Sequence, residues 1–130
     1  MQPCLSSSGT DTDLFVALRE LRSDGSDVVA QGAQDTNLPV AMGCLRASLR
    51  KTDPKRSSEF RAWHPYDEVQ ALRPGVPVEL DVNLWPTAWV IQKGYQLVLD
   101  IGGSEQAGMI TFTHPPAGPW RPDGVSAISI

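Results

Sequence analysis

The side chains that could carry out chemistry are few in this 130-residue chain, and none has the spacing that a catalytic group requires. Serine hydrolases of the α/β type hold their nucleophile in a G-x-S-x-G turn. No such pentapeptide occurs, because Gly25-Ser26 and Gly103-Ser104 lack the flanking pattern. The two histidines, His64 and His114, each precede a proline, and we interpret both as surface or loop-packing residues. The sequence therefore predicts no catalytic residue.

Two close pairs of aspartates lie in segments that resemble oxygen-rich loops. Asp11 and Asp13 flank Thr12, and Asp24 and Asp27 lie across a predicted hairpin. Loops of this kind on β-sandwiches can bind calcium, but the spacing falls well short of an EF-hand. The cysteines and histidines also lack the spacing of zinc ligands. We interpret the aspartates as a capped strand start and an ordinary turn, and we predict neither a metal nor a cofactor.

Four tryptophans are many for a chain of this length. Exposed tryptophans can stack on sugars, but they also cover core edges or meet another domain. We favour packing and interface roles, and keep a free-standing carbohydrate- or partner-binding module as the alternative function. The four residues are Trp63, Trp85, Trp89 and Trp120.

Composition excludes several classes of function. The formal net charge of −4 argues against a nucleic-acid surface, which needs clustered Lys and Arg. We interpret the single basic cluster as a solvated strand end. It comprises Arg46, Arg50, Lys51, Lys55 and Arg56. No apolar run approaches the ~20 residues of a membrane span, and the N-terminus has no signal-peptide pattern. Two distant cysteines, Cys4 and Cys44, are expected to be free thiols in a cytoplasmic protein.

The strongest structural pattern is a strand–turn–strand unit over Val76–Ile101. Apolar residues alternate with polar ones from Val78 to Leu84, and a second alternating run ends at Ile101. Pro86 cannot donate a ladder hydrogen bond, so the first strand should end near Trp85. The Lys93-Gly94 pair supplies a turn residue that tolerates positive φ. This pattern predicts two neighbouring antiparallel strands.

Further strands complete the expected fold, which is an all-β sandwich of the jelly-roll type. The expected strands are Asp13–Leu21, Asp27–Gln31, Val40–Arg50, one around Met109–Thr113, and one from Val125 to Ile130. A flexible tail is expected over residues 1–10. The long connection Lys51–Gly75, with a short helical turn at Tyr66–Leu72, is of a length that often covers an active site or a partner surface.

Several segments in fixed order resemble the C-terminal domain of the X-Pro dipeptidyl-peptidase and cocaine-esterase family of serine hydrolases. The segments are Thr10-Asp-Thr-Asp-Leu-Phe-Val-Ala-Leu18 with Ser23-Asp-Gly-Ser-Asp27, Gly43-Cys-Leu-Arg-Ala-Ser-Leu-Arg50, Pro54-Lys-Arg-Ser57 with His64, Asp67-Glu68 and Leu72-Arg-Pro-Gly75, and Leu84-Trp-Pro-Thr87 with Gly94-Tyr-Gln-Leu97. The resemblance extends over about residues 11–104 and fades from Glu105 onward.

The resemblance implies a galactose-binding-like jelly roll over residues 11–130, packed in the parent enzyme against an α/β-hydrolase domain. That other domain would carry the Ser-Asp-His triad, and this one would help wall the substrate pocket and support assembly. No catalytic residue carries over, so the chain is expected to be inactive alone although the parent family has dipeptidyl-peptidase or ester-hydrolase activity.

The resemblance also leads us to expect a domain truncated at both ends. Strands of the family pattern upstream of Asp11-Thr-Asp13 and beyond Ile130 are absent from the sequence. Missing strands would leave open sheet edges with unpaired backbone groups. We therefore expect marginal stability or self-association of the chain.

Overall fold

The smaller of two antiparallel sheets is built around the N-terminal segment. The computed structural model describes residues 2–32, 37–103 and 125–129. In this sheet, β1 (Cys4–Ser7) lies between β5 (Val78–Glu79) and β7 (Val125–Ser129). Leu5 pairs with Val78 on one edge of β1 and with Ile128 on the other. The strand expected from Val125 onward is therefore confirmed, and the first and last strands of the described chain are neighbours.

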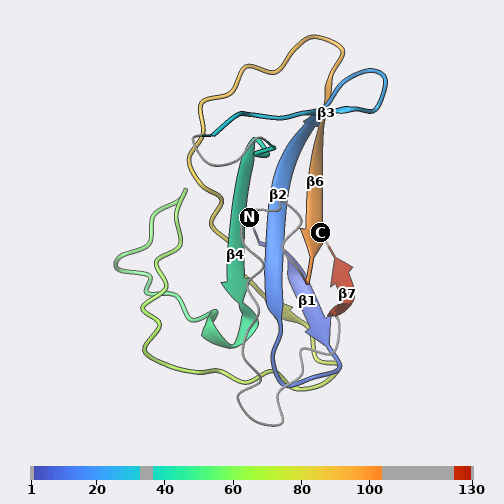
Figure 1. The fold of residues 1–130 in the computed structure, drawn as a ribbon. Coiled ribbons are helices and arrows are strands. Elements are labelled where there is room, and N and C mark those ends of the chain that lie inside the picture. The colour runs from blue at the N-terminus through green and yellow to red at the C-terminus, as the bar shows by residue number, and fades with distance from the viewer. Residues whose placement is uncertain (1, 33–36, 104–124, 130) are drawn as a thin grey trace.

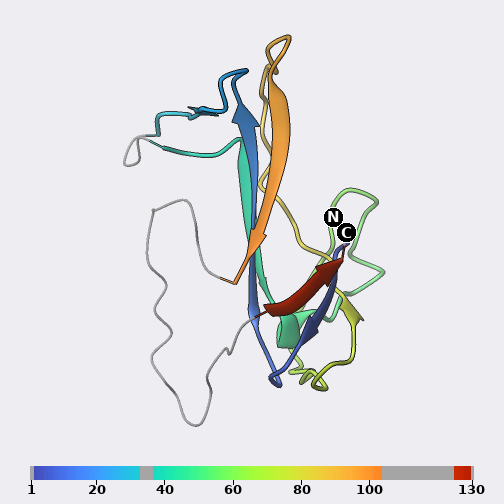
Figure 2. The ribbon, with the colours of Figure 1, turned by 90° about the vertical axis from the view of Figure 1, so that its right-hand side faces the viewer.

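The larger sheet is built around β2 (Asp13–Leu21), the strand with apolar residues on both faces. One edge of β2 pairs with β4 (Ala41–Arg46) and, at its end, with β3 (Asp27–Val28). The other edge pairs along seven residues with β6 (Gln96–Gly102). Figure 1 shows β2 between β4 and β6, and Figure 2 shows the smaller sheet on one side of the larger. The predicted all-β sandwich is confirmed.

The core lies between the two sheets and follows the period-two pattern of the strands. Leu14 and Val16 of β2 are buried, whereas their neighbours Phe15 and Ala17 are half-buried on the outer face of the larger sheet. The core is a single cluster of fully or nearly fully buried side chains. Its members are Leu5, Leu14, Val16, Leu45, Ala47, Leu72, Leu80 and Val82.

The expected flexible tail over residues 1–10 is wrong. Leu5 of β1 is completely buried, and Pro3 accepts a hydrogen bond of 3.0 Å from the Leu80 amide. Composition misled the prediction, because serines dominate the segment. Ser7 is 1% exposed, and its side-chain oxygen accepts a hydrogen bond from the Gly9 amide. Small hydroxyl side chains can be buried when they find partners in this way.

The expected pair of neighbouring strands over Val76–Ile101 is also wrong in its pairing. The first strand is only Val78–Glu79 and belongs to the smaller sheet, whereas β6 belongs to the larger. Between them the chain crosses from one sheet to the other. The Leu80 amide bonds to Pro3 on one side, and the Trp85 amide bonds to Met42 of β4 on the other. The apolar alternation was interpreted correctly as burial, since Leu80 and Val82 are in the core.

Two smaller expectations need correction. The strand expected over Val40–Arg50 stops at Arg46 and continues as a 3-10 turn, η1 (Ala47–Leu49). The turn buries Ser48, which is 2% exposed. The helical turn expected at Tyr66–Leu72 is absent from the described structure, where these residues are irregular. The strand expected around Met109–Thr113 lies outside the described residues.

A buried carboxylate attaches the chain between β5 and β6 to the end of β2. Glu20, near the end of β2, is 1% exposed. Its carboxylate accepts hydrogen bonds from the Trp89 indole Nε1 at 2.7 Å and from the Gln92 amide at 3.0 Å. The turn at Gly94, with φ of 89°, then leads into β6 as predicted.

Removal of the Glu20 carboxylate should release the segment around Trp89 and Gln92 from β2. We expect Glu20→Ala to lower the free energy of unfolding by about 1–3 kcal/mol, because two N–H groups lose their acceptor. Trp89 fluorescence should shift to the red as the indole becomes hydrated. Urea denaturation and emission spectra measure both effects, with the exposed Glu59→Ala as the control. Equal behaviour of the two variants would contradict this role of Glu20.

Candidate docking surface

The connection of residues 51–75 forms a lobe beside β4, and backbone hydrogen bonds attach it to the sandwich. Figure 1 shows this lobe in green, projecting away from the larger sheet. The amides of Gln70, Leu72 and Gly75 donate to the carbonyls of Ser48, Thr10 and Ser7 over 2.7–2.8 Å. The returning half of the connection is therefore fixed along much of its length, although it contains no helix or strand.

Asp11, one of the candidate calcium ligands, has a structural role where β4 ends. It is 4% exposed, and its Oδ1 accepts from the amides of Thr12 and Ser48 at 2.8 and 2.7 Å. The Ser48 hydroxyl donates to the other carboxylate oxygen. Asp11 thus provides the hydrogen-bond acceptor for a backbone amide in the first turn of η1. These hydrogen bonds explain why the polar Ser48 is buried.

The remaining candidate aspartates also bond to neighbouring protein groups. Asp13 forms an ion pair with Arg46 across β2 and β4 at 2.8 Å, and this hydrogen bond raises the pKa of Arg46. Asp27 pairs with Arg19 at 2.7 Å. Asp24 accepts from the Ser26 hydroxyl and amide, which lowers the pKa of Asp24. Within the described ranges, no three His, Cys, Asp or Glu side chains group together as metal ligands would.

The outgoing half of the lobe ends in a two-residue turn, referred to below as the tip hairpin (residues 58–61). Ser58 and Arg61 form an antiparallel bridge, with amide-to-carbonyl distances of 2.9 and 3.3 Å. Glu59 and Phe60 occupy the tip. Neither has positive φ, so the turn differs from the primed types that dominate two-residue strand hairpins.

The base of the tip hairpin is held by side chains that imitate strand pairing. The Asn83 amide accepts from the Ala62 backbone N at 3.0 Å and donates to the Ala62 carbonyl at 2.8 Å. The Ser57 hydroxyl donates to the Asp53 carbonyl at 2.7 Å and accepts from the Trp63 amide at 2.9 Å. The Asn83 bonds connect the hairpin to residues 80–85, the crossing segment between the two sheets, whereas the Ser57 bonds lie within the lobe.

Trp63 closes the base of the tip hairpin from the outside. The Arg56 guanidinium lies 3.8 Å from the ring centroid, and that of Arg61 lies 5.7 Å from it. Cations within about 6 Å of an indole are attracted to its face. The Trp63 face is therefore occupied by the protein's own side chains, which confirms a packing role for this tryptophan.

His64 joins the lobe to the crossing segment. It is 7% exposed, and its two ring nitrogens lie 3.1 Å from the Lys51 carbonyl oxygen and 2.8 Å from that of Asp81. The predicted loop-packing role of His64 is confirmed, whereas His114 lies outside the described residues. Next to it, Tyr66 has a φ of 56° and stacks on the His64 ring at 5.9 Å. A tyrosine rarely takes that backbone conformation without a surrounding structure that holds it.

Ion pairs join the first residue of the lobe to its returning half. The Lys51 ammonium lies 3.0 Å from Glu68 and 3.1 Å from Asp67. Hydrogen bonding to Glu68 and then Asp67 raises the pKa of Lys51, and the same contact lowers the pKa of Glu68 below its ordinary value of 4.5. The contribution of the Lys51–Glu68 pair to stability is present at neutral pH and is lost as the pH falls through the folded pKa of Glu68.

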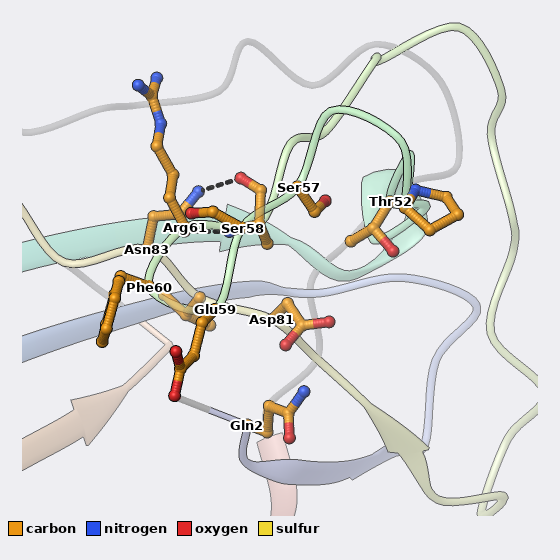
Figure 3. A pocket seen from close by; sticks show the side chains of 12 residues that line it. Gln2, Thr52, Ser57, Ser58, Glu59, Phe60, Arg61, Asp81 and Asn83 are labelled. Carbon is orange, nitrogen blue, oxygen red and sulfur yellow. Dashed lines mark hydrogen bonds between the residues drawn. The ribbon is translucent and has the colours of Figure 1, made fainter.

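A hollow of about 510 Å³ lies between the tip hairpin and the crossing segment. Figure 3 shows Glu59, Asp81 and Gln2 around this space, with the Phe60 ring pointing away from Asp81. Sequence reasoning identified the connection as a candidate partner surface but missed the hollow. Its walls come from three distant segments, the N-terminus, the lobe and the crossing segment, and no local pattern brings them together.

The lobe carries exposed apolar side chains on an ordered backbone. Phe60 is 91% exposed, Val69 is 72% exposed and Tyr66 is 63% exposed. Exposed apolar groups on an ordered surface are typical of interaction sites. Of the two cysteines, Cys4 is half-buried in β1 and Cys44 is exposed in β4. None of the helical structure in the described part of the chain is long and apolar enough to cross a membrane.

Comparison with known families connects this geometry to a class of protein. Residues 4–122 match the family described as the X-Pro dipeptidyl-peptidase C-terminal non-catalytic domain. The chain belongs to this family. The match begins at the first residue of β1, so the family pattern includes the segment that we had expected to be a tail, and it extends beyond Glu105, where we had expected the similarity to fade.

Solved structures agree with the family assignment. One CocE/NonD family hydrolase structure from Staphylococcus aureus is 27% identical with a TM-score of 0.72, covering 80% of this chain and 20% of its own. A second such structure from the same organism is 24% identical with a TM-score of 0.75, covering 98% of this chain and 23% of its own. The chain thus spans about a fifth of the length of these hydrolases. None of the curated proteins matches it.

Proposed function

We propose that this chain serves as the non-catalytic C-terminal β-sandwich domain of a serine hydrolase with dipeptidyl-peptidase or ester-hydrolase activity. In that enzyme it walls the substrate pocket and supports assembly. The observation that carries the proposal is the family match over residues 4–122, to a domain that is itself described as non-catalytic. The similarity to one fifth of a CocE/NonD hydrolase supports it, because the other four fifths leave room for a catalytic domain.

The lobe supports the architectural part of the proposal. A wall of a pocket needs a surface that keeps its shape and still offers contacts to another domain. The lobe has both properties, since its backbone is bonded to the sandwich while Phe60, Tyr66 and Val69 are exposed. Long connections in compact domains commonly have such roles.

A carbohydrate-binding module finds less support in the described residues. The indole N–H of Trp89 is bonded to Glu20, and the face of Trp63 is covered by Arg56. Trp85, at 58% exposed, is the most accessible of the three described tryptophans, and Trp120 lies outside the described residues. Sugar rings stack on open aromatic faces. Two of the three described tryptophans already contact the protein's own side chains, so we do not propose this function.

The proposal extends to location and partners. A cytoplasmic location is supported by the low cysteine content, since the whole sequence holds two cysteines that lie 40 positions apart. The net charge of −4 supports partners other than nucleic acid. Self-association of the separate chain is part of the proposal too, since a surface that meets a catalytic domain in the enzyme is available to a second copy when that domain is removed.

Isolation of the chain provides the direct test of the proposed function. We expect the purified 130-residue chain to hydrolyse neither p-nitrophenyl esters nor X-Pro anilides above the buffer rate, because the reaction belongs to another domain. A spectrophotometric assay measures the turnover, with a phenylmethylsulfonyl fluoride-treated sample as the control for contaminating serine hydrolases. Turnover that co-purifies with the chain and survives repurification would refute the proposal.

A further inference from the structure

The tip hairpin points to a specific contact with the catalytic domain. We infer that Phe60 is an apolar anchor that docks this domain onto the α/β-hydrolase domain of the parent enzyme, an inference that rests on the proposed function. Phe60 is 91% exposed, the highest value among the large hydrophobic side chains in the described part of the chain. Exposed phenylalanines of this kind become the buried anchors of interfaces.

The backbone under Phe60 is ordered before any partner binds. Hydrogen bonds close the hairpin at Ser58 and Arg61, and the Asn83 amide holds Ala62 from the other side. The stacked Arg56 and Trp63 support its base. Little conformational freedom remains to be lost when Phe60 is buried, and this preorganisation favours binding. The backbone position of Phe60 is therefore fixed by the domain itself.

The surroundings of Phe60 define the chemistry of the surface that it fits. The hollow of about 510 Å³ beside the hairpin is lined by two acidic residues, Glu59 and Asp81, and by Arg61 and Phe60. Figure 3 shows the Glu59 carboxylate extending toward Gln2 and the Arg61 side chain extending in the opposite direction. A complementary surface therefore has an apolar depression for Phe60 next to a basic side chain that enters the hollow.

The rest of the hydrolase is the partner that the comparisons favour. The chain covers 20% and 23% of the two CocE/NonD hydrolase structures, so about four fifths of each relative lies outside the matched part. A domain of this size meets the remainder of such a chain through some surface, and the lobe is the ordered part that presents Phe60 for burial. We therefore place the α/β-hydrolase domain against the lobe.

Photo-crosslinking at the native locus tests the contact, whether the catalytic domain lies in the same chain or in another. An amber codon at position 60 introduces p-benzoylphenylalanine in the source cells, and mass spectrometry identifies the linked peptide after irradiation. We expect a peptide from an α/β-hydrolase domain, at about tenfold or more the yield from a probe at Val29, which is 44% exposed and lies next to β3. No product at position 60, a yield equal to that at Val29, or a peptide from any other protein, including a second copy of this domain, would overturn the inference.

A second probe separates this inference from the proposed function. Position 17 lies on the outer face of the larger sheet, where Phe15 and Ala17 are half-buried. Links to a hydrolase domain from position 17 but not from position 60 overturn the anchor and leave the proposed function standing. Links from neither position overturn both. Phe60→Ala should keep the urea midpoint of the separate 130-residue chain, where the side chain is 91% exposed, and should weaken the docking in the parent enzyme on the order of tenfold.

Discussion

Gly43→Ala is expected to cost about 3 kcal/mol of unfolding free energy, because the new methyl group has no space. A Cβ at position 43 of β4 would lie 2.0 Å from the Asn83 carbonyl oxygen and 3.0 Å from its carbonyl carbon. The clash is with backbone, so no side-chain rotation relieves it. Gly43 has no positive φ, and the requirement for glycine therefore comes from the close approach of two chain segments.

The same substitution should also loosen the tip hairpin. Displacement of residue 83 would strain the bond between Trp85 and Met42 and the two bonds between Asn83 and Ala62. We therefore expect the amide of Ala62 to lose protection from hydrogen exchange along with the loss of global stability. Urea denaturation and exchange measured by NMR report the two effects separately.

Gly9→Ala is the matched control for Gly43→Ala. A Cβ at position 9 would lie 3.5 Å from the Asp11 carbonyl oxygen and 3.7 Å from the Ser7 hydroxyl, and both are ordinary contact distances. Its stability should stay the same or rise by up to about 1 kcal/mol, since alanine restricts the unfolded chain. If Gly43→Ala were as stable as this control, the close approach of the crossing segment to β4 would be wrong.

Leu5→Ala is expected to lower the unfolding free energy by about 2–5 kcal/mol, the range for truncation of a buried leucine. Leu5 is 0% exposed and belongs to the core cluster together with Leu14 and Leu80. The cavity cannot collapse easily, because β1 is paired on both edges, with β5 and β7. Urea denaturation gives the difference directly.

Val69→Ala provides the comparison for Leu5→Ala, since Val69 is an apolar side chain that is 72% exposed. We expect it to change stability by no more than about 0.5 kcal/mol. A small effect of Leu5→Ala, similar to that of Val69→Ala, would restore the interpretation of residues 1–10 as a tail. A large effect would show that the N-terminal residues are part of the sandwich in solution.

The sequence predicted which residues are buried better than it predicted which strands are neighbours. β2 has the bounds that were expected, and the glycines at 25 and 94 have the positive φ that their turns require. The alternation through Leu80 and Val82 was also interpreted correctly as burial. A period of two, however, records only which face is buried. It does not reveal that β5 pairs with β1 while β6 pairs with β2.

The candidate site was less predictable, for a physical reason. Residues 51–75 could be identified as an unusually long connection, but the features that order it depend on distant partners. Asn83 reaches Ala62, His64 reaches Asp81, and Ser48 reaches Asp11, over separations that no local pattern reports. The exposure of Phe60 depends on the same contacts, because they hold the tip hairpin away from the core.

The segment between Leu80 and Trp85 is bonded to one sheet at its start and to the other at its end, with Asn83 attached to the lobe between them. A force on the lobe would therefore be transmitted to both sheets of the sandwich. Because the segment is attached at two points, we do not expect the lobe to rotate about a hinge. Under the proposed function, the lobe would present a fixed surface to the catalytic domain, and any movement that opens a cavity there would come from that other domain.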